Sequence, residues 1–148
     1  MMLTIRTTVW FSILICLASA DRLIKEFIKI YPTSDQGGFF YLSYYPNENL
    51  AFGLPVPSWF SIPLIALVLI FIFYLISLAY YKNNYQLFAA TTLIFIGGIS
   101  NLMDRLLYGY IIDFMHLWFL PIFNLADIYL LVGLLLLIPL LTNKQHVS

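Results

Sequence analysis

Residues 58–81 form an apolar stretch without a single charge, and this stretch limits the folds open to the chain more than any other feature. A helix that crosses a bilayer needs about 20 such residues. Three further apolar stretches lie at about 7–24, 87–107 and 124–141. Because no water satisfies backbone groups inside a bilayer, these stretches are expected as helices. We therefore predict an all-α membrane protein with four transmembrane helices in one domain.

The composition agrees with a membrane protein. Residues of the AVILMFWYC set make up 62% of the 148-residue chain and charged residues only 9%, whereas a soluble domain carries roughly 25% charged residues. Seven Lys and Arg balance seven Asp and Glu, so no basic excess points to nucleic acid as a partner. The one cysteine, Cys16, and two histidines are too few for a disulfide framework or a structural zinc site. No metal or cofactor is predicted.

An even number of spans places both termini on the same side of the membrane. Arg6, Lys82 and Lys144 then face that side, and all seven acids lie toward the other. The count of Lys and Arg on the two sides is nearly even, so the positive-inside rule does not fix the orientation. The short turn at Lys82 favours the cytoplasm, which predicts cytoplasmic termini and an extracytoplasmic segment at about 27–57.

The first twenty residues also resemble a cleaved signal peptide. Arg6, an apolar run and the small residues 18–20 precede Asp21, as at a cleavage site. The helical pattern continues past this point, however, and Asp21 and Lys25 are spaced i,i+4 for an ion pair on one helical face. We predict an uncleaved first helix.

Two polar clusters lie where ionisable residues are costly and therefore suggest a function. In the first, Asn101, Asp104 and Arg105 share one helical face next to Gly97 and Gly98, which allow another helix to approach closely. A structural alternative is that Asp104 and Arg105 are a neutralised pair that ends the helix.

The second cluster combines Asp113, in the short β-like run 111–114, with Asn124 and Asp127 at the start of the last helix. Here the structural alternative is an N-cap, with Asn124 as the capping residue and Asp127 in the first turn. Taken together, the two clusters contain more acids than basic partners at one membrane face. Structural pairing alone does not explain this excess.

Other chemistry fits the chain less well. The sequence lacks the HExxH motif of zinc metalloproteases. An intramembrane serine protease would have to use Ser100 with His116, which is predicted on a loop. A small transporter could use the same acids as an ion relay, but it would need them near the middle of the bilayer, whereas they cluster at one edge.

Five short motifs, in the same order along the chain, resemble those of the lipoprotein signal peptidase (signal peptidase II) family of bacterial aspartic membrane proteases. They are D-x-x-x-K at Asp21–Lys25, an N-x-G-x-A-F-G-like run at Asn47–Gly53, G-x-x-G-N-x-x-D-R at Gly97–Arg105, V-D-F at 112–114 and F-N-x-A-D at Phe123–Asp127. Asn49 and Ser100 replace glycines of the family, Arg22 replaces a common glutamine, and the segment between the last two motifs is shorter than usual. These departures leave a non-catalytic family member open as an alternative.

The resemblance implies that Asp113 and Asp127 are a catalytic dyad that cuts a prolipoprotein just before its diacylglyceryl-modified cysteine. Two adjacent carboxylates repel each other, so the pair should hold one shared proton near neutral pH. The resemblance also implies a protein of the bacterial cytoplasmic membrane with its active site near the extracytoplasmic face. Residues 27–57 would form a small β-like cradle, membrane lipids would line the helices, and the protein would act as a monomer.

The remaining polar residues of the motifs are expected to support this dyad. Hydrogen bonds that orient the dyad or hold the substrate are expected from Asn101, Arg105 and Asn124, and Asn47 is expected to shape the substrate groove. Structural support is expected from the Asp21–Lys25 pair, which would brace the first helix, and from Asp104, which would position Arg105.

Overall fold

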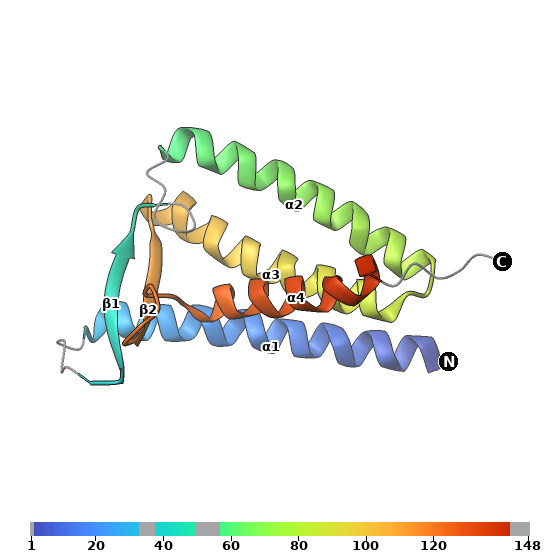
Figure 1. Cartoon of the computed structure of the whole chain (residues 1–148), viewed down its shortest axis with the longest axis horizontal. Helices are drawn as coiled ribbons and strands as arrows, with labels where there is room; N and C mark the ends of the chain where they lie inside the picture. The colour runs from blue at the N-terminus through green and yellow to red at the C-terminus, as the bar shows by residue number, and fades with distance from the viewer. Residues whose placement is uncertain (1, 33–37, 50–56, 143–148) are drawn as a thin grey trace.

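The computed structural model describes residues 2–32, 38–49 and 57–142. In chain order, the described elements are α1 (Met2–Ile30), β1 (Phe40–Asn47), α2 (Ser58–Tyr81), α3 (Tyr85–Tyr108), β2 (Ile111–Leu117) and α4 (Leu125–Thr142) (Figure 1). Each helix overlaps one of the predicted apolar stretches, which confirms a mostly helical fold.

Two helices among the described residues are long and apolar enough to cross a membrane. They are Trp59–Tyr81, with a mean hydropathy of 2.8, and Tyr85–Tyr108, with a mean hydropathy of 1.4. The apolar part of α4, Leu125–Leu140, is shorter. Spanning by α1 and α4 therefore stays a prediction.

Helix α1 continues past its predicted end at residue 24 and passes through Asp21 without a break. The predicted pair is confirmed, because Lys25 Nζ lies 2.9 Å from Asp21 Oδ2. A second pair of the same spacing joins Arg22 and Glu26. Such i,i+4 pairs form only when the backbone between them is helical, so these charged residues extend the helix.

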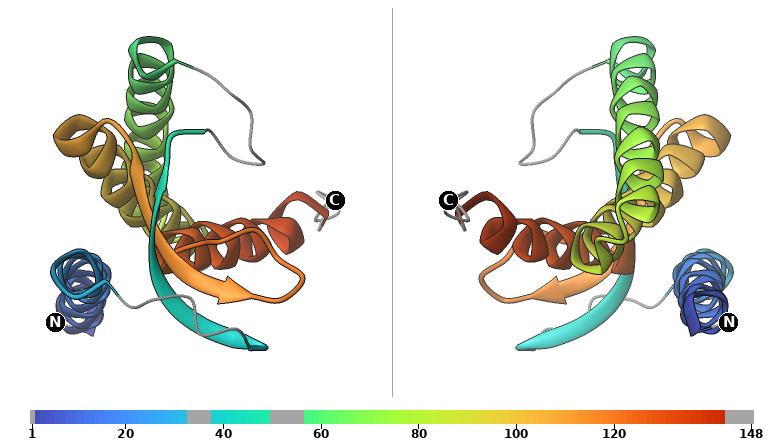
Figure 2. Two further views of the ribbon diagram at one scale, coloured as in Figure 1. Left: turned by 90° about the vertical axis from the view of Figure 1, so that its left-hand side faces the viewer. Right: turned by 90° about the vertical axis from the view of Figure 1, so that its right-hand side faces the viewer.

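Helix α3 lies at the centre of the bundle, with α4, α2 and α1 packed around it (Figure 2). Small residues bring α3 and α4 close together, as the glycines predicted. A Cβ atom at Gly97 would lie 2.4 Å from the carbonyl oxygen of Ala126, and one at Gly133 would lie 2.7 Å from that of Ala90. Only glycine therefore fits at these two crossings.

Both ends of α3 carry capping residues. The Asn84 side chain accepts a hydrogen bond from the backbone N–H of Leu87 at 3.0 Å and so caps the first turn. Gly109 ends the helix with φ 84°, a left-handed conformation that glycine adopts without strain. The chain then turns directly into β2.

Strands β1 and β2 pair antiparallel, with Asn47 opposite Ile111. The prediction that the cradle lies within residues 27–57 was incomplete, because the second strand of the sheet comes from the chain between α3 and α4. A strand needs a partner for its backbone groups, and the segment 27–57 has a single described strand. On its other side, β2 bridges to Phe123, whose backbone N–H donates to the Met115 carbonyl at 3.1 Å.

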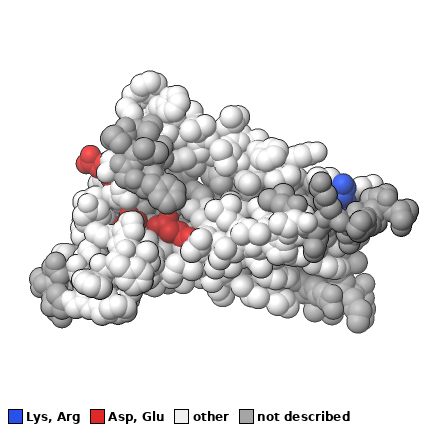
Figure 3. Space-filling model, viewed as in Figure 1, with Lys and Arg blue, Asp and Glu red and all other residues white. Residues whose placement is uncertain are grey.

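The sheet lies at one end of the molecule. The opposite end holds the start of α1, the end of α4 and the α2–α3 turn at Lys82 (Figure 1). In the space-filling view, acidic atoms reach the surface at the sheet end and basic atoms at the opposite end, with uncharged surface between them (Figure 3). Lys144, motif residues 50–53 and the side chain of Arg6 lie outside the described residues.

Candidate active site

The two predicted catalytic aspartates come from different elements. Asp113 lies in β2 and is 2% exposed, and Asp127 lies half-buried in the first turn of α4. Asn124 contacts both carboxylates. Its Nδ2 atom donates to Asp113 Oδ1 at 2.7 Å, and its backbone N–H donates to Asp127 Oδ2 at 3.1 Å. The structure thus places both acids around one residue.

Asn124 also begins α4. Its side-chain oxygen accepts a hydrogen bond from the backbone N–H of Asp127 at 3.0 Å, while the Asp127 carboxylate bonds back to the Asn124 backbone. This reciprocal arrangement is a capping box, which satisfies two backbone donors at a helix start. The structural alternative is therefore confirmed for these two residues, and the same geometry also supports a catalytic arrangement.

Each carboxylate receives a second hydrogen bond from an amide side chain. Asn101 Nδ2 donates to Asp127 Oδ1 at 2.9 Å, and Asn47 Nδ2 donates to Asp113 Oδ2 at 2.8 Å. The amides of Asn101 and Asn124 also bond to each other, at 3.2 Å. Three amide side chains from β1, α3 and the start of α4 thus surround the two acids; contacts from Asn101 and Asn124 were expected, whereas Asn47 was expected to shape the substrate groove.

Burial raises the pKa of Asp113 to about 7. The hydrogen bonds from Asn47 and Asn124 oppose this shift, and the nearby charge of Asp127 adds to it. A carboxyl group with this pKa exchanges its proton near neutral pH, which suits a group that acts in acid–base chemistry.

Arg105 does not contact either aspartate through a hydrogen bond in the described structure. Its guanidinium, which is buried, donates to the backbone carbonyl oxygens of Asn49 at 2.5 Å and Glu48 at 3.4 Å. These carbonyls directly follow Asn47, whose side-chain oxygen accepts from the Asn49 backbone N–H at 3.0 Å. Arg105 therefore holds the chain at the end of β1, next to Asn47, and its charge also interacts with that of Asp113.

The prediction that Asp104 positions Arg105 is wrong in this structure. Asp104 is fully buried and lies 2.8 Å from Lys25 Nζ and 2.6 Å from the guanidinium of Arg22. Adjacent residues on a helix point in different directions, and the Asp104 side chain turns toward α1. Lys25, Asp21 and Asp104 therefore form one buried charge cluster between α1 and α3.

Ser100 belongs to the same cluster, although the sequence marked it only as a departure from a glycine and as the residue that a serine protease would need. Its hydroxyl donates to the carboxylate of Asp21 and lies 3.3 Å from Lys25 Nζ. The available signal was its place next to Asn101 on α3, but a partner on α1 cannot be read from spacing within α3. These contacts also remove the basis of the serine-protease alternative, because His116 bonds to Ser43 instead, at 2.8 Å.

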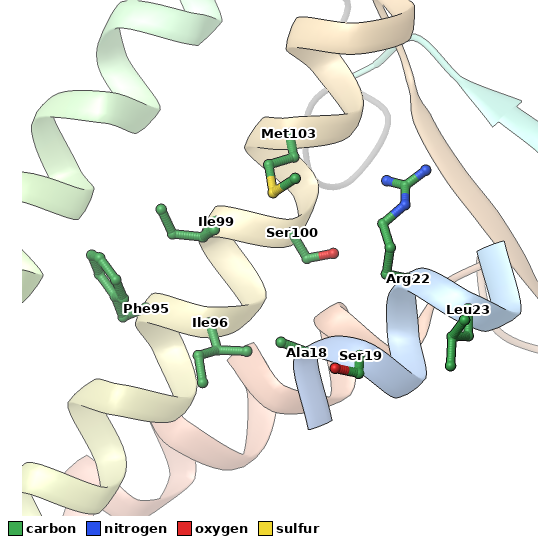
Figure 4. A pocket seen from close by; sticks show the side chains of 9 residues that line it. All are labelled: Ala18, Ser19, Arg22, Leu23, Phe95, Ile96, Ile99, Ser100 and Met103. Atoms are coloured by element: carbon green, nitrogen blue, oxygen red, sulfur yellow. The ribbon is translucent and has the colours of Figure 1, made fainter. Parts of the chain in front are cut away.

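An apolar groove of about 550 Å³ lies beside this cluster, between α1 and α3 (Figure 4). Its lining includes Ala18 and Leu23 of α1 and Ile96 and Ile99 of α3, with Ser100 directed toward α1. Over this stretch the two helices are separated by an open groove, so the charge cluster is a main connection between them. Among the described residues, no group of three or more His, Cys, Asp or Glu could hold a metal ion.

The fold is that of bacterial membrane enzymes. One solved structure, described as a bacterial membrane enzyme structure obtained by the in meso method at 2.3 Å resolution, matches with a TM-score of 0.74 and 24% identity, over 93% of this chain and 92% of the other. A second structure of the same description, at 1.9 Å resolution, matches with a TM-score of 0.72 and 23% identity, over 90% and 92%. This likeness concerns the fold alone.

The sequence identifies the family. The sequence model of the signal peptidase (SPase) II family matches residues 13–142 of this chain. The lipoprotein signal peptidase of Streptococcus thermophilus is 37% identical over 87% of this chain and 82% of its own length. The lipoprotein signal peptidase of Syntrophomonas wolfei is 35% identical over 85% of this chain and 89% of its own length. The chain therefore belongs to the signal peptidase II family, which confirms the resemblance carried by the five motifs and makes the protein a membrane protease.

Proposed function

We propose that the protein is an aspartic endopeptidase that removes the signal peptide of a prolipoprotein by cutting just before its diacylglyceryl-modified cysteine. Asp113 and Asp127 form the catalytic dyad. The observation that carries this proposal is the position of Asn124, which donates one hydrogen bond to each carboxylate. Two acids from different elements, joined in this way and fixed by further amides, form an arrangement suited to activating a water molecule.

The dyad acts with one shared proton, since two ionised carboxylates at close range repel each other. The ionised carboxylate takes a proton from a water molecule, whose oxygen attacks the scissile carbonyl carbon. The protonated carboxyl donates a hydrogen bond to the carbonyl oxygen. When the C–N bond breaks, a proton passes from the dyad to the amine of the lipidated cysteine. The two apparent pKa values belong to the pair and not to either residue.

Amide side chains hold the two acids in this arrangement. Asn101 and Asn47 each donate to one carboxylate, and with the two bonds from Asn124 every carboxylate oxygen of the dyad accepts a hydrogen bond. Arg105 fixes the end of β1, and within the described structure its buried Nε atom has no hydrogen-bond partner.

We further propose that all four helices span the bacterial cytoplasmic membrane as one domain, with both termini in the cytoplasm and the dyad near the extracytoplasmic face. The position of the sheet, opposite the start of α1 and the end of α4, supports this topology (Figure 1). Many exposed apolar side chains of α2, such as Trp59 and Phe71, would then contact lipid. The protein would act as a monomer on a lipidated substrate. An ion-relay function gains no support, because the acids lie at one end of the bundle.

The dyad is tested by cleavage of a purified diacylglyceryl-prolipoprotein, followed by mass spectrometry of the product. We expect the wild-type protein to release a product that begins with the lipidated cysteine, and Asp113→Asn and Asp127→Asn to release none while remaining folded in detergent. Glu48→Gln is the matched control, because it replaces an acid by an amide at an exposed position one residue after Asn47. Cleavage by either dyad variant would refute the assignment, and equal cleavage of an unlipidated precursor would refute the substrate class.

A further inference from the structure

The ammonium group of Lys25 is fully buried and has four polar neighbours. Asp21 Oδ2 lies at 2.9 Å, Asp104 Oδ2 at 2.8 Å, Asn101 Oδ1 at 3.2 Å and Ser100 Oγ at 3.3 Å. A buried charge is costly unless partners surround it. Lys25 therefore lies at a point where α1 and α3 are held together by directed contacts.

Both carboxylates that flank Lys25 also bond to the backbone next to the dyad. Asp21 Oδ1 accepts from the backbone N–H of Ala126 at 3.1 Å, and Ala126 directly precedes the aspartate of α4. Asp104 Oδ2 accepts from the backbone N–H of Ile112 at 3.2 Å, and Ile112 directly precedes the aspartate of β2. One ammonium thus connects, through two carboxylates, to the backbone beside each catalytic acid.

A third connection passes through Asn101. Its side-chain oxygen accepts from Lys25 Nζ, and its side-chain nitrogen donates to Asp127 Oδ1 at 2.9 Å. An amide can present either end to a neighbour, and a cation selects the oxygen. Lys25 therefore turns the donor end of this amide toward the catalytic carboxylate.

We propose that Lys25 is a positioning residue for the dyad, which sets the spacing of the two acids through Asp21 and Asp104 and the orientation of the Asn101 amide. This inference rests on the proposed function of Asp113 and Asp127. It differs from a role in bracing the first helix, since bracing alone would affect folding and leave the chemical step unchanged.

The first test compares Lys25→Met with Lys29→Met, which makes the same change one turn further along α1. Lys29 lies over the ring of Tyr108 at 3.7 Å and contacts no residue beside the dyad. We expect Lys25→Met to lower kcat about 100-fold, as small displacements of reacting groups do, with KM changed less than about twofold. Lys29→Met should keep kcat within about twofold of the wild type. A folded Lys25→Met protein with unchanged kcat would overturn the proposal.

Lys25→Met removes the ion-pair partner of buried Asp21 and one of the two partners of buried Asp104, and it can prevent folding, so a second variant is needed. Asp104→Asn keeps the side-chain shape and an acceptor for the Ile112 N–H but removes the ion pairs with Lys25 and Arg22. We expect a folded protein, judged by its elution and thermal transition in detergent, with kcat about tenfold lower and KM unchanged. Unchanged kcat here would equally overturn the proposal.

A double-variant comparison shows whether Lys25 acts through Asn101. If it does, the double variant Lys25→Met/Asn101→Ala loses activity by a smaller factor than the product of the two single-variant losses. If the two residues act independently, the loss in the double variant equals that product. Wild-type cleavage together with the loss in Asp127→Asn tests the proposed function separately. Failure of the dyad and failure of the Lys25 proposal are therefore distinguishable.

Discussion

At the scale of single residues, Asn124 is the residue on which the site most depends. It begins a helix, donates to both Asp113 and Asp127 and bonds to Asn101. The capping bond also holds the hydrogen bond to Asp113 in place, since an amide that is fixed as a helix cap cannot rotate away from that carboxylate. Local helix formation and catalytic geometry are thus combined in one side chain.

The two roles of Asn124 can be separated by substitution. Ser is a good N-cap but cannot reach Asp113 as an amide donor, whereas Ala does neither. We expect Asn124→Ser to keep the thermal stability of the wild type and to lose activity roughly 10- to 100-fold, as for one hydrogen bond to a charged group. Asn124→Ala should lose similar activity and also about 1 kcal/mol of stability. Thermal unfolding and cleavage rates check both values, and an active Asn124→Ser variant would contradict the assignment.

The pH dependence of cleavage should follow from the proton held by the dyad. Because the pKa of Asp113 is raised to about 7, the shared proton is present below this pH and is lost as the pH rises through it. We expect kcat to fall on the alkaline side of about pH 7. The hydrogen bond from Asn47 lowers the pKa of Asp113, so Asn47→Ala should move this alkaline limb to higher pH. A limb that stays in place or moves to lower pH would argue against Asp113 as the proton carrier.

At the scale of elements, the crossing of α3 and α4 determines where Asp127 lies. The two helices touch at Gly97, where a Cβ would lie 2.4 Å from the carbonyl oxygen of Ala126, one residue before Asp127. On the neighbouring face of α3, a Cβ at Gly98 would meet the flexible end of the Leu69 side chain at 2.7 Å. The contact at Gly97 is with the backbone of α4, which cannot shift locally. The contact at Gly98 is with the end of a side chain, which can rotate away.

These adjacent glycines provide a matched pair of variants. We expect Gly97→Ala to cost about 1–3 kcal/mol of stability, as overpacking does, and to reduce kcat because the displaced α4 carries Asp127 with it. Gly98→Ala should change stability and kcat little, since the Leu69 side chain can shift and alanine favours the helix. Thermal unfolding in detergent and cleavage rates measure the difference. Equal effects of the two substitutions would show that the α3–α4 crossing does not control the site.

At the scale of the whole molecule, the separation of the sheet from the far helix ends predicts a fixed orientation in the membrane. Glu48 lies beside β1 at the sheet end, and Lys82 lies in the α2–α3 turn at the other end. If the dyad faces the extracytoplasmic side, these two positions are on opposite sides of the bilayer.

Cysteine labelling tests this orientation. Cys16 is the single native cysteine, so Glu48→Cys and Lys82→Cys are each made in a Cys16→Ser background. We expect a membrane-impermeant maleimide to label the Glu48→Cys protein in intact cells and the Lys82→Cys protein only after permeabilisation. The reverse pattern would place the dyad in the cytoplasm.

Sequence reasoning succeeded for several features that depended on neighbours along the chain. The helices at the apolar stretches, the Asp21–Lys25 pair, the capping role of Asn124 and the β-like run around Asp113 all depend on such local spacing. Asn101 and Asn124 were also predicted as hydrogen-bond donors to the dyad or the substrate, but by position in motifs shared with a family.

The partners that lie far apart in the sequence could not be predicted in the same way. The placement of Asp104 against Lys25, of Ser100 against Asp21, and of Arg105 against β1 depends on how each helix is rotated about its axis. That rotation results from the packing of several helices at once, including the glycine contacts of α3. A sequence pattern shows which face of a helix is polar, but it does not show which neighbour that face meets.

The apolar groove between α1 and α3 has a consequence for how the enzyme matures. Lys25 of α1 and Asp104 of α3 form a buried ion pair beside this groove, so an inserted chain whose first helix has not yet docked would leave each charge without the other. Docking would pair these charges in the same event that fixes the backbone beside Asp113 and Asp127. If these two aspartates are the catalytic pair, we expect a chain with an undocked first helix to be inactive.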